Sequence, residues 1–259
     1  MISEKQIPSP SRLVESLRDT GYSHQAAFAD IVDNCIAANA SNVVIDITQD
    51  FMGNDLSVAF YDKGEGMSVD ELKNAMRYGS DKRPSPKSLG KFGMGLKTAS
   101  TAFCRRLSVI SIKDNVPSIR VWDIDEIIDQ DEWVLLEPNL DEYSKYLDKL
   151  KTLTDGSGTV VIWTRVDRLI TNNGTDYIQK AMDTIIAEIS QHLSATFGKF
   201  LIGVDNFNNT QADAFTQPEV TITVNDLVIE GWNPNGLFLN VDDNDDRVIS
   251  EIKTREVRL

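Results

Sequence analysis

Two clusters of glycine constrain this chain more than any other feature. The first is Asp62-Lys63-Gly64-Glu65-Gly66-Met67, and the second is Gly90-Lys91-Phe92-Gly93-Met94-Gly95-Leu96-Lys97. Glycine allows positive φ angles and close approach of the backbone to another group. The polar run between the clusters, residues 78–88, carries Pro84 and Pro86, which exclude a helix interior or a central strand. This pattern predicts a small-molecule site with a mobile segment over it.

Charge narrows the class of ligand. The formal net charge of −14 favours solubility and argues against a surface-wide nucleic-acid footprint. Between Lys73 and Arg106, however, nine Lys or Arg residues accompany a single acid, Asp81. This basic island suits a compact polyanion such as a nucleotide, and a solvated lysine-rich loop is the open alternative.

Length and cysteine content indicate the number of domains and the cellular compartment. The 259 residues suffice for one large domain, or for one domain and part of another. Cys35 and Cys104 each lie in an apolar helical pattern, and we interpret both as buried core residues in a reducing compartment. The N-terminal residues lack an apolar signal region, and no run is long enough to span a membrane. We therefore expect a cytoplasmic protein with no membrane partner.

Hydrophobic periodicity predicts alternating helices and strands. Helices are expected over residues 11–18, 24–38, 69–76, 95–103, 141–150 and 176–197. Strands are expected over residues 42–48, 56–61, 107–112, 118–122, 133–136, 160–164, 220–224, 227–229 and 248–252. Ser23 is expected to cap the helix at 24–38, and Ser68 and Glu71 are expected to form a capping box.

The helix at 24–38 carries the first candidate site residues. Asp30 and Asn34 are four positions apart, so their Cβ atoms lie about 6 Å apart on one side of the helix. They belong either to the wet face of an amphipathic helix or to the edge of a cavity, and their apolar neighbours favour the cavity. Asp62 follows the strand at 56–61 directly, so its carboxylate is presented at a strand end.

The second glycine cluster suits phosphate binding. Gly93, Gly95 and their neighbours begin a predicted helix, where backbone N–H groups are available to a polyphosphate, with Lys97 as a nearby point charge. The cluster is not a Walker A loop, because Leu96 stands where glycine is required. The first cluster does not extend to the dinucleotide fingerprint either.

Taken together, the order and spacing of these segments resemble the GHKL ATPase superfamily. The segments are Asp30…Asn34, Asp62-x-Gly64-x-Gly66, Gly90-x-Phe92-Gly93-x-Gly95 and Gly158-Thr159. That superfamily includes DNA gyrase, the ninety-kilodalton heat-shock chaperones, histidine kinases and MutL. Phe92–Lys97 and Ile31–Asn34 are most similar to the MORC branch and related prokaryotic ATP-binding proteins. The resemblance covers residues 10–166 well and the remainder more loosely.

The resemblance implies an α+β fold of the Bergerat type. This is an α/β sandwich whose mixed sheet is covered by helices on one face, followed by the start of a second, transducer-like α/β domain. The implied ATP-binding domain is residues 1–168, and the implied second domain is residues 169–259. The sequence ends within a strand pattern, so we expect a fragment that lacks the transducer lysine of the superfamily.

The resemblance also assigns site residues for ATP and Mg²⁺. Asp62 would accept the adenine amino group with Thr159 beside it, Gly66 and Met67 would border the base, and Gly64 belongs to the same binding set. Asn34 would ligate magnesium together with phosphate oxygens and water. The lid end would hold the β- and γ-phosphates through Gly90, Lys91, Phe92, Gly93, Met94, Gly95, Leu96 and Lys97.

One residue departs from the pattern of the superfamily. Its general base is usually a Glu four residues before the magnesium Asn, and here that place holds Asp30. Asp is one methylene shorter, and a misplacement of about 1 Å can cost roughly a hundredfold in rate. Either the helix lies closer to the nucleotide, Asp30 acts through an extra water molecule, or ATP is hydrolysed slowly. We expect Asp30 to be the catalytic residue, with Asp33 as the weaker candidate.

Two functions follow from these expectations. The first is magnesium-dependent ATP hydrolysis in which lid closure drives N-terminal dimerisation, giving a nucleotide-gated clamp. The alternative is a nucleotide-sensing interaction module with little or no turnover. A DNA or protein client that binds through other regions is implied by the resemblance alone. A histidine kinase is disfavoured, because neither His24 nor His192 suits a phosphoacceptor.

Overall fold

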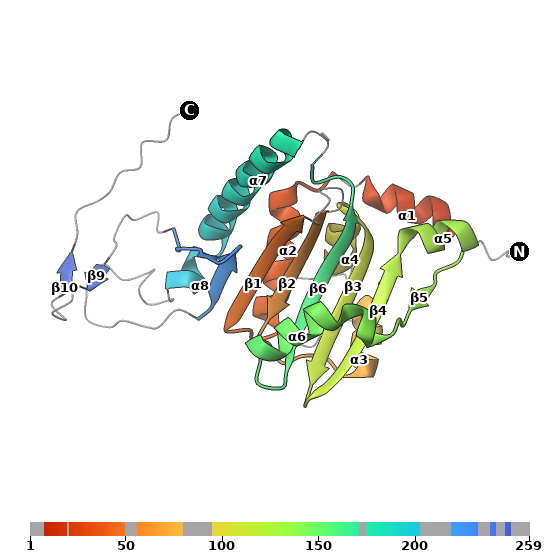
Figure 1. Ribbon diagram of the computed structural model, residues 1–259, viewed down its shortest axis with the longest axis horizontal. Coiled ribbons are helices and arrows are strands. Elements are labelled where there is room, and N and C mark those ends of the chain that lie inside the picture. The colour runs from red at the N-terminus through yellow and green to blue at the C-terminus, as the bar shows by residue number, and fades with distance from the viewer. Residues whose placement is uncertain are drawn as a thin grey trace, which may run out of the picture.

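The computed structural model describes residues 8–19, 21–49, 56–79, 95–170, 175–202, 219–232, 239–241 and 247–249. Its main feature is an eight-stranded sheet in the order β5-β4-β3-β6-β2-β1-β7-β8 (Figure 1). The β1–β7 pair is parallel and the other pairs are antiparallel, so the sheet is mixed. The strands are β1 (Asn42–Gln49), β2 (Leu56–Asp62), β3 (Cys104–Lys113), β4 (Val116–Asp123), β5 (Leu135–Leu136), β6 (Gly158–Val166), β7 (Thr221–Val224) and β8 (Leu227–Val228). A separate pair contains β9 (Leu239–Val241) and β10 (Arg247–Ile249).

Helices pack on this sheet in two unequal layers. The helices are α1 (Pro10–Arg18), α2 (His24–Ala37), α3 (Val69–Met76), α4 (Gly95–Thr101), α5 (Ile124–Gln130), α6 (Ser144–Leu153), α7 (Thr175–Thr196) and α8 (Gly198–Ile202). One apolar core joins the first five helices and α7 to one face, and a smaller core joins α6 and the 3₁₀ turn Leu140–Tyr143 to the other. The predicted α+β class with a mixed sheet is confirmed, and α6 adds cover on the second face (Figure 1).

Aromatic packing fixes α2 across the middle of the sheet. Phe28 of α2 meets Phe60 of β2 and Trp163 of β6 edge-on, with ring centroids 4.9 and 5.3 Å apart. All three side chains are fully buried. Edge-to-face contacts of this kind add to the free energy gained from burial, so this face of α2 is held firmly. Asp30 and Asn34 lie on the same helix, beside this anchor.

Most predicted helices and strands are present, with small shifts at their ends. The Ser23 hydroxyl accepts a hydrogen bond from the Ala26 amide, and the capping box of Ser68 and Glu71 is complete. The strand predicted at 133–136 is confined to β5, and the helix predicted at 141–150 begins as a 3₁₀ turn before α6. Part of the strand predicted at 248–252 lies outside the described residues.

One placement from the sequence was wrong. Cys104 lies not in a helix but at the first position of β3, because α4 ends at Thr101 and the following residues pair with β4 and β6. Cys35 does lie in a helix, and both thiols are free and buried. Strand pairing over the length of β3 outweighs the short helical pattern before it.

Residues beyond 168 extend the main sheet and the helices on its larger core. Strand β7 pairs in parallel with β1, and α7 packs against α2. Residues on both sides of the predicted boundary therefore share one sheet, and the boundary between 168 and 169 stays a prediction. Among the helices of the described part of the chain, none combines the length and apolar character needed to cross a membrane.

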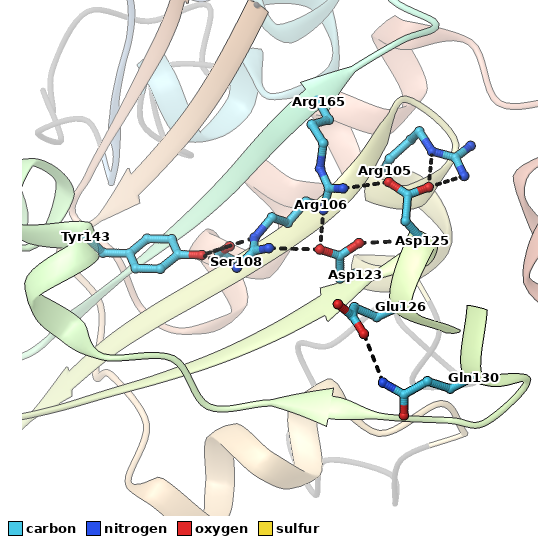
Figure 2. Close-up of polar contacts among 9 residues, drawn as sticks. All are labelled: Arg105, Arg106, Ser108, Asp123, Asp125, Glu126, Gln130, Tyr143 and Arg165. Atoms are coloured by element: carbon cyan, nitrogen blue, oxygen red, sulfur yellow. Dashed lines mark hydrogen bonds and ion pairs between the residues drawn. The ribbon is translucent and has the colours of Figure 1, made fainter. Parts of the chain in front are cut away.

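A network of ion pairs lies near the ends of β3, β4 and β6 (Figure 2). Asp123 caps α5 and pairs with Arg106 and Arg165, while Asp125 pairs with Arg105 and Arg165. The side chain of Asp123 is 4% exposed, whereas that of Asp125 is 40% exposed. The network fastens α5 to β3 and β6.

Candidate functional site

Asp62 lies at the last position of β2, on the face of the sheet that packs against α2. Its side chain is buried, and its Oδ1 accepts a hydrogen bond of 2.9 Å from the Gly64 amide. The Cys35 thiol of α2 donates a hydrogen bond of 3.2 Å to the Ile31 carbonyl oxygen. Burial, followed by the negative charge of the nearby Asp62 carboxylate, raises the pKa of the thiol. Cys35 therefore stays protonated, and this part of α2 lies beside the end of β2.

A row of polar side chains crosses the sheet from Asp62. In register, Asp62 lies opposite Thr159 of β6, and Thr159 lies opposite Ser111 of β3. The Ser111 and Thr159 hydroxyls are 2.9 Å apart, and Ser111 also accepts a hydrogen bond of 2.8 Å from the Met67 amide. Sequence reasoning found Thr159 and Met67 but missed Ser111. The available signal was a serine at a core-facing position of β3, two residues after the buried Val109.

The loop after β2 fits only glycine at two positions. Gly66 has φ +65°, and a Cβ there would lie 1.9 Å from the Ile112 carbonyl oxygen. A Cβ on Gly64 would lie 2.7 Å from Asp62 Oδ1 and 2.8 Å from the Ala38 carbonyl oxygen. The loop is thus held tightly between β3 and the C-terminal end of α2, as the predicted close approach requires.

Asp30 and Asn34 lie on α2, which packs against α4. Asp30 Oδ2 accepts a hydrogen bond of 2.9 Å from the Tyr22 hydroxyl and lies 3.8 Å from the place of a Cβ on Gly95. The Asn34 side-chain amide donates to the Asp30 carbonyl oxygen at 2.6 Å. That bond engages the nitrogen of the Asn34 side chain, so its oxygen is the atom suited to a hard cation such as Mg²⁺.

A second carboxylate, that of Asp33, lies near Asp30. Asp33 is half-buried, and burial, followed by repulsion from Asp30, raises its pKa. A divalent cation would relieve this repulsion. The described residues contain no group of three His, Cys, Asp or Glu side chains that could hold a metal. An ion held by one Asn, phosphate oxygens and water does not need such a group.

The second glycine cluster is described only from Gly95 onward. Leu96 is half-buried against the core, and the fully buried Lys97 donates from Nζ to the Ala75 carbonyl oxygen of α3 at 2.8 Å. The remaining predicted residues of this cluster lie outside the described residues: Gly90, Lys91, Phe92, Gly93 and Met94.

Helix α2 brings the two halves of the predicted site together. Asp30 lies beside Gly95, and eight residues later the Ala38 carbonyl accepts a hydrogen bond of 3.0 Å from the Glu65 amide in the loop after Asp62. Eight helical residues span about 12 Å. Both candidate halves therefore border one helix and do not lie on unrelated surfaces.

Comparison with known proteins decides the family. A family model described as "Histidine kinase-, DNA gyrase B-, and HSP90-like ATPase" matches residues 22–159, more than half of the chain. The chain belongs to this ATPase family. The match begins at Tyr22, ends at Thr159 and includes both glycine clusters. Membership of the ATPase family implies ATP binding, and the predicted resemblance is confirmed.

Two curated proteins are similar to part of this ATPase-family chain. ATPase morc-1 of Caenorhabditis elegans is 28% identical over 115 residues, which are 43% of this chain and 13% of that protein. Mouse ATPase MORC2B is 28% identical over 96 residues, which are 36% of this chain and 9% of that protein. These matches confirm the predicted similarity to the MORC branch, and they span a small part of each relative.

Proposed function

We propose that this chain binds ATP with magnesium along α2 and hydrolyses it slowly, with Asp30 as the general base. One observation carries the proposal. Helix α2 borders the buried Asp62 carboxylate through Cys35 near its C-terminus and the start of α4 through Asp30 near its middle. This arrangement suits a ligand with a base at one end and a charged tail at the other.

The half of the site around Asp62 is suited to adenine. A buried carboxylate accepts from the exocyclic amino group of the base, and Thr159 lies beside it in register. The loop of Gly64, Gly66 and Met67 packs closely against Ile112 and Ser111. Its backbone is therefore held beside Asp62, and these three residues would border the base. A base that presents a carbonyl at the same position would face the carboxylate and be rejected.

The half around Asp30 is suited to phosphate chemistry. Asn34 would hold magnesium, which supplies positive charge to the phosphate oxygens when bound. Asp30 would accept the proton of the attacking water. Its shorter side chain, compared with Glu, is the reason for expecting slow turnover. Gly95 and Leu96, followed by Lys97, would form the described end of the phosphate-binding segment.

We further propose that bound ATP closes the cover segment predicted at residues 78–88 over the site and brings two chains together. The support is family membership and the basic composition of residues 73–106. A DNA or protein client stays a prediction from the resemblance alone.

Phosphate release with and without magnesium tests the proposed reaction. Asn34→Ala should abolish turnover that depends on Mg·ATP, because it removes the proposed metal ligand. Undiminished hydrolysis by that variant would count decisively against the proposal. The exposed Asn74→Ala is the matched control and should leave turnover unchanged.

A measurement of the oligomeric state distinguishes the proposed ATPase from the alternative function, a nucleotide-sensing interaction module. That function is favoured by the Asp at the position of the base, and it predicts that a non-hydrolysable analogue changes the oligomeric state while ATP is not turned over. Turnover that Asp30→Ala abolishes would exclude this alternative and support the ATPase.

A further inference from the structure

Tyr22 lies just before α2, and its side chain extends along the first turns of that helix. Gly21, with φ +77°, turns the chain after α1, and Ser23 caps the helix that follows. From this position the half-buried phenol extends to Asp30, and its hydroxyl donates a hydrogen bond of 2.9 Å to Oδ2. Its ring packs against the main core, which limits its movement.

The same hydroxyl also connects α2 with α4. It hydrogen-bonds Thr98 as well as Asp30, and burial, then the bond to Asp30, raises the pKa of Tyr22. The phenol is therefore protonated at neutral pH and acts as a donor to the carboxylate. Asp30 Oδ2 also lies 3.8 Å from the place of a Cβ on Gly95, so the hydroxyl lies where the two helices meet.

We propose that Tyr22 is a positioning residue that holds the Asp30 carboxylate for ATP hydrolysis. The inference rests on the proposed function. A hydrogen bond to Oδ2 fixes the rotamer of Asp30 and leaves Oδ1 to accept the proton of a water molecule. Fixed geometry matters more for Asp than for Glu, because the shorter side chain has less reach with which to correct its position.

The test is Tyr22→Phe in the full chain, which removes the hydroxyl and keeps the ring. Single-turnover hydrolysis of radiolabelled ATP should slow about 10- to 100-fold. The dissociation constant for Mg·ATP should stay within about twofold, because the hydroxyl is not proposed to touch the nucleotide. Tyr143→Phe is the control: it removes a hydroxyl bonded to Arg106 and Ser108, and turnover should not change.

A second comparison asks whether Tyr22 acts through Asp30. In an Asp30→Asn background, adding Tyr22→Phe should slow the residual reaction no further. A further loss there, an unchanged rate in the single Tyr22 variant, or weakened ATP binding by it would each overturn the inference while leaving the proposed function intact. A wild-type chain that binds no ATP, or that binds ATP without turnover, would instead overturn the proposed ATPase and this inference with it.

Discussion

Among the glycines that the structure describes, Gly66 is the position where a side chain is least tolerable. Two costs coincide there: a positive φ, and a Cβ that would overlap the Ile112 carbonyl oxygen at 1.9 Å. Positive φ alone costs about 1–2 kcal/mol for alanine, and overlap with rigid backbone adds to it. We expect Gly66→Ala to lower the free energy of unfolding by about 3 kcal/mol or more, as measured by urea denaturation.

Gly79 provides the control for this prediction. It has φ +67°, and a Cβ there would meet no atom of the described residues within 4 Å. Gly79→Ala should therefore show only the cost of the backbone angle, about 1–2 kcal/mol. Equal losses in the two variants would contradict the close approach of the loop to β3.

Asp33 gives a prediction about pH. Burial and the nearby Asp30 raise the pKa of Asp33 above its ordinary value of 3.8, so the folded chain binds this proton more tightly than the unfolded chain. As the pH rises, the unfolded chain ionises first, so the cost to stability begins above the unfolded pKa, is complete above the folded pKa and is absent at more acid pH. Asp33→Asn should therefore raise the melting temperature at neutral pH, with the gain disappearing below about pH 3.5.

Asp148, exposed on α6, is the comparison for Asp33. Asp148→Asn should change the melting temperature much less at either pH. A gain for Asp33→Asn that persists at acid pH would show that charge is not its cause.

At the scale of elements, the ion-pair network shows whether the burial of a carboxylate or the number of its arginine partners decides how much it stabilises the fold. Asp123 and Asp125 each pair with two arginines, but only the Asp123 carboxylate is buried. Asp123→Asn keeps a good cap for α5 and should lower the free energy of unfolding by about 2 kcal/mol. Asp125→Asn should cost less than about 1 kcal/mol, because exposed pairs contribute little. Equal losses in urea denaturation would contradict this account.

Helices and strands with strong hydrophobic periodicity could be predicted from the sequence. Those that depend on pairing between distant strands were harder to predict. The α2 stripe and both serine caps carry local signals, and they are present. Helix α5 was missed, because its seven residues are too few for a clear period, although Asp123 is a good cap. Cys104 was placed in a helix, because nothing local reveals that β3 pairs with strands on both sides.

For the whole molecule, candidate residues such as Asp30 and Asp62 could be predicted from the sequence, but the contacts between distant segments could not. Asp30 and Gly95, or Met67 and Ser111, meet only because distant segments pack together. Tyr22 and Ser111 were missed for this reason: each is an ordinary polar residue until its partner is known. The order of glycines and acids was enough to predict the family, which the family match confirms.

The central claim is that one nucleotide lies along α2, between Asp62 and the start of α4. A crystal structure with magnesium and a non-hydrolysable ATP analogue tests it most directly. We predict the adenine amino group about 3 Å from the Asp62 carboxylate and the metal about 2.1 Å from the Asn34 side-chain oxygen. A nucleotide bound on another surface, with Asp62 and Asn34 both uncontacted, would contradict the claim.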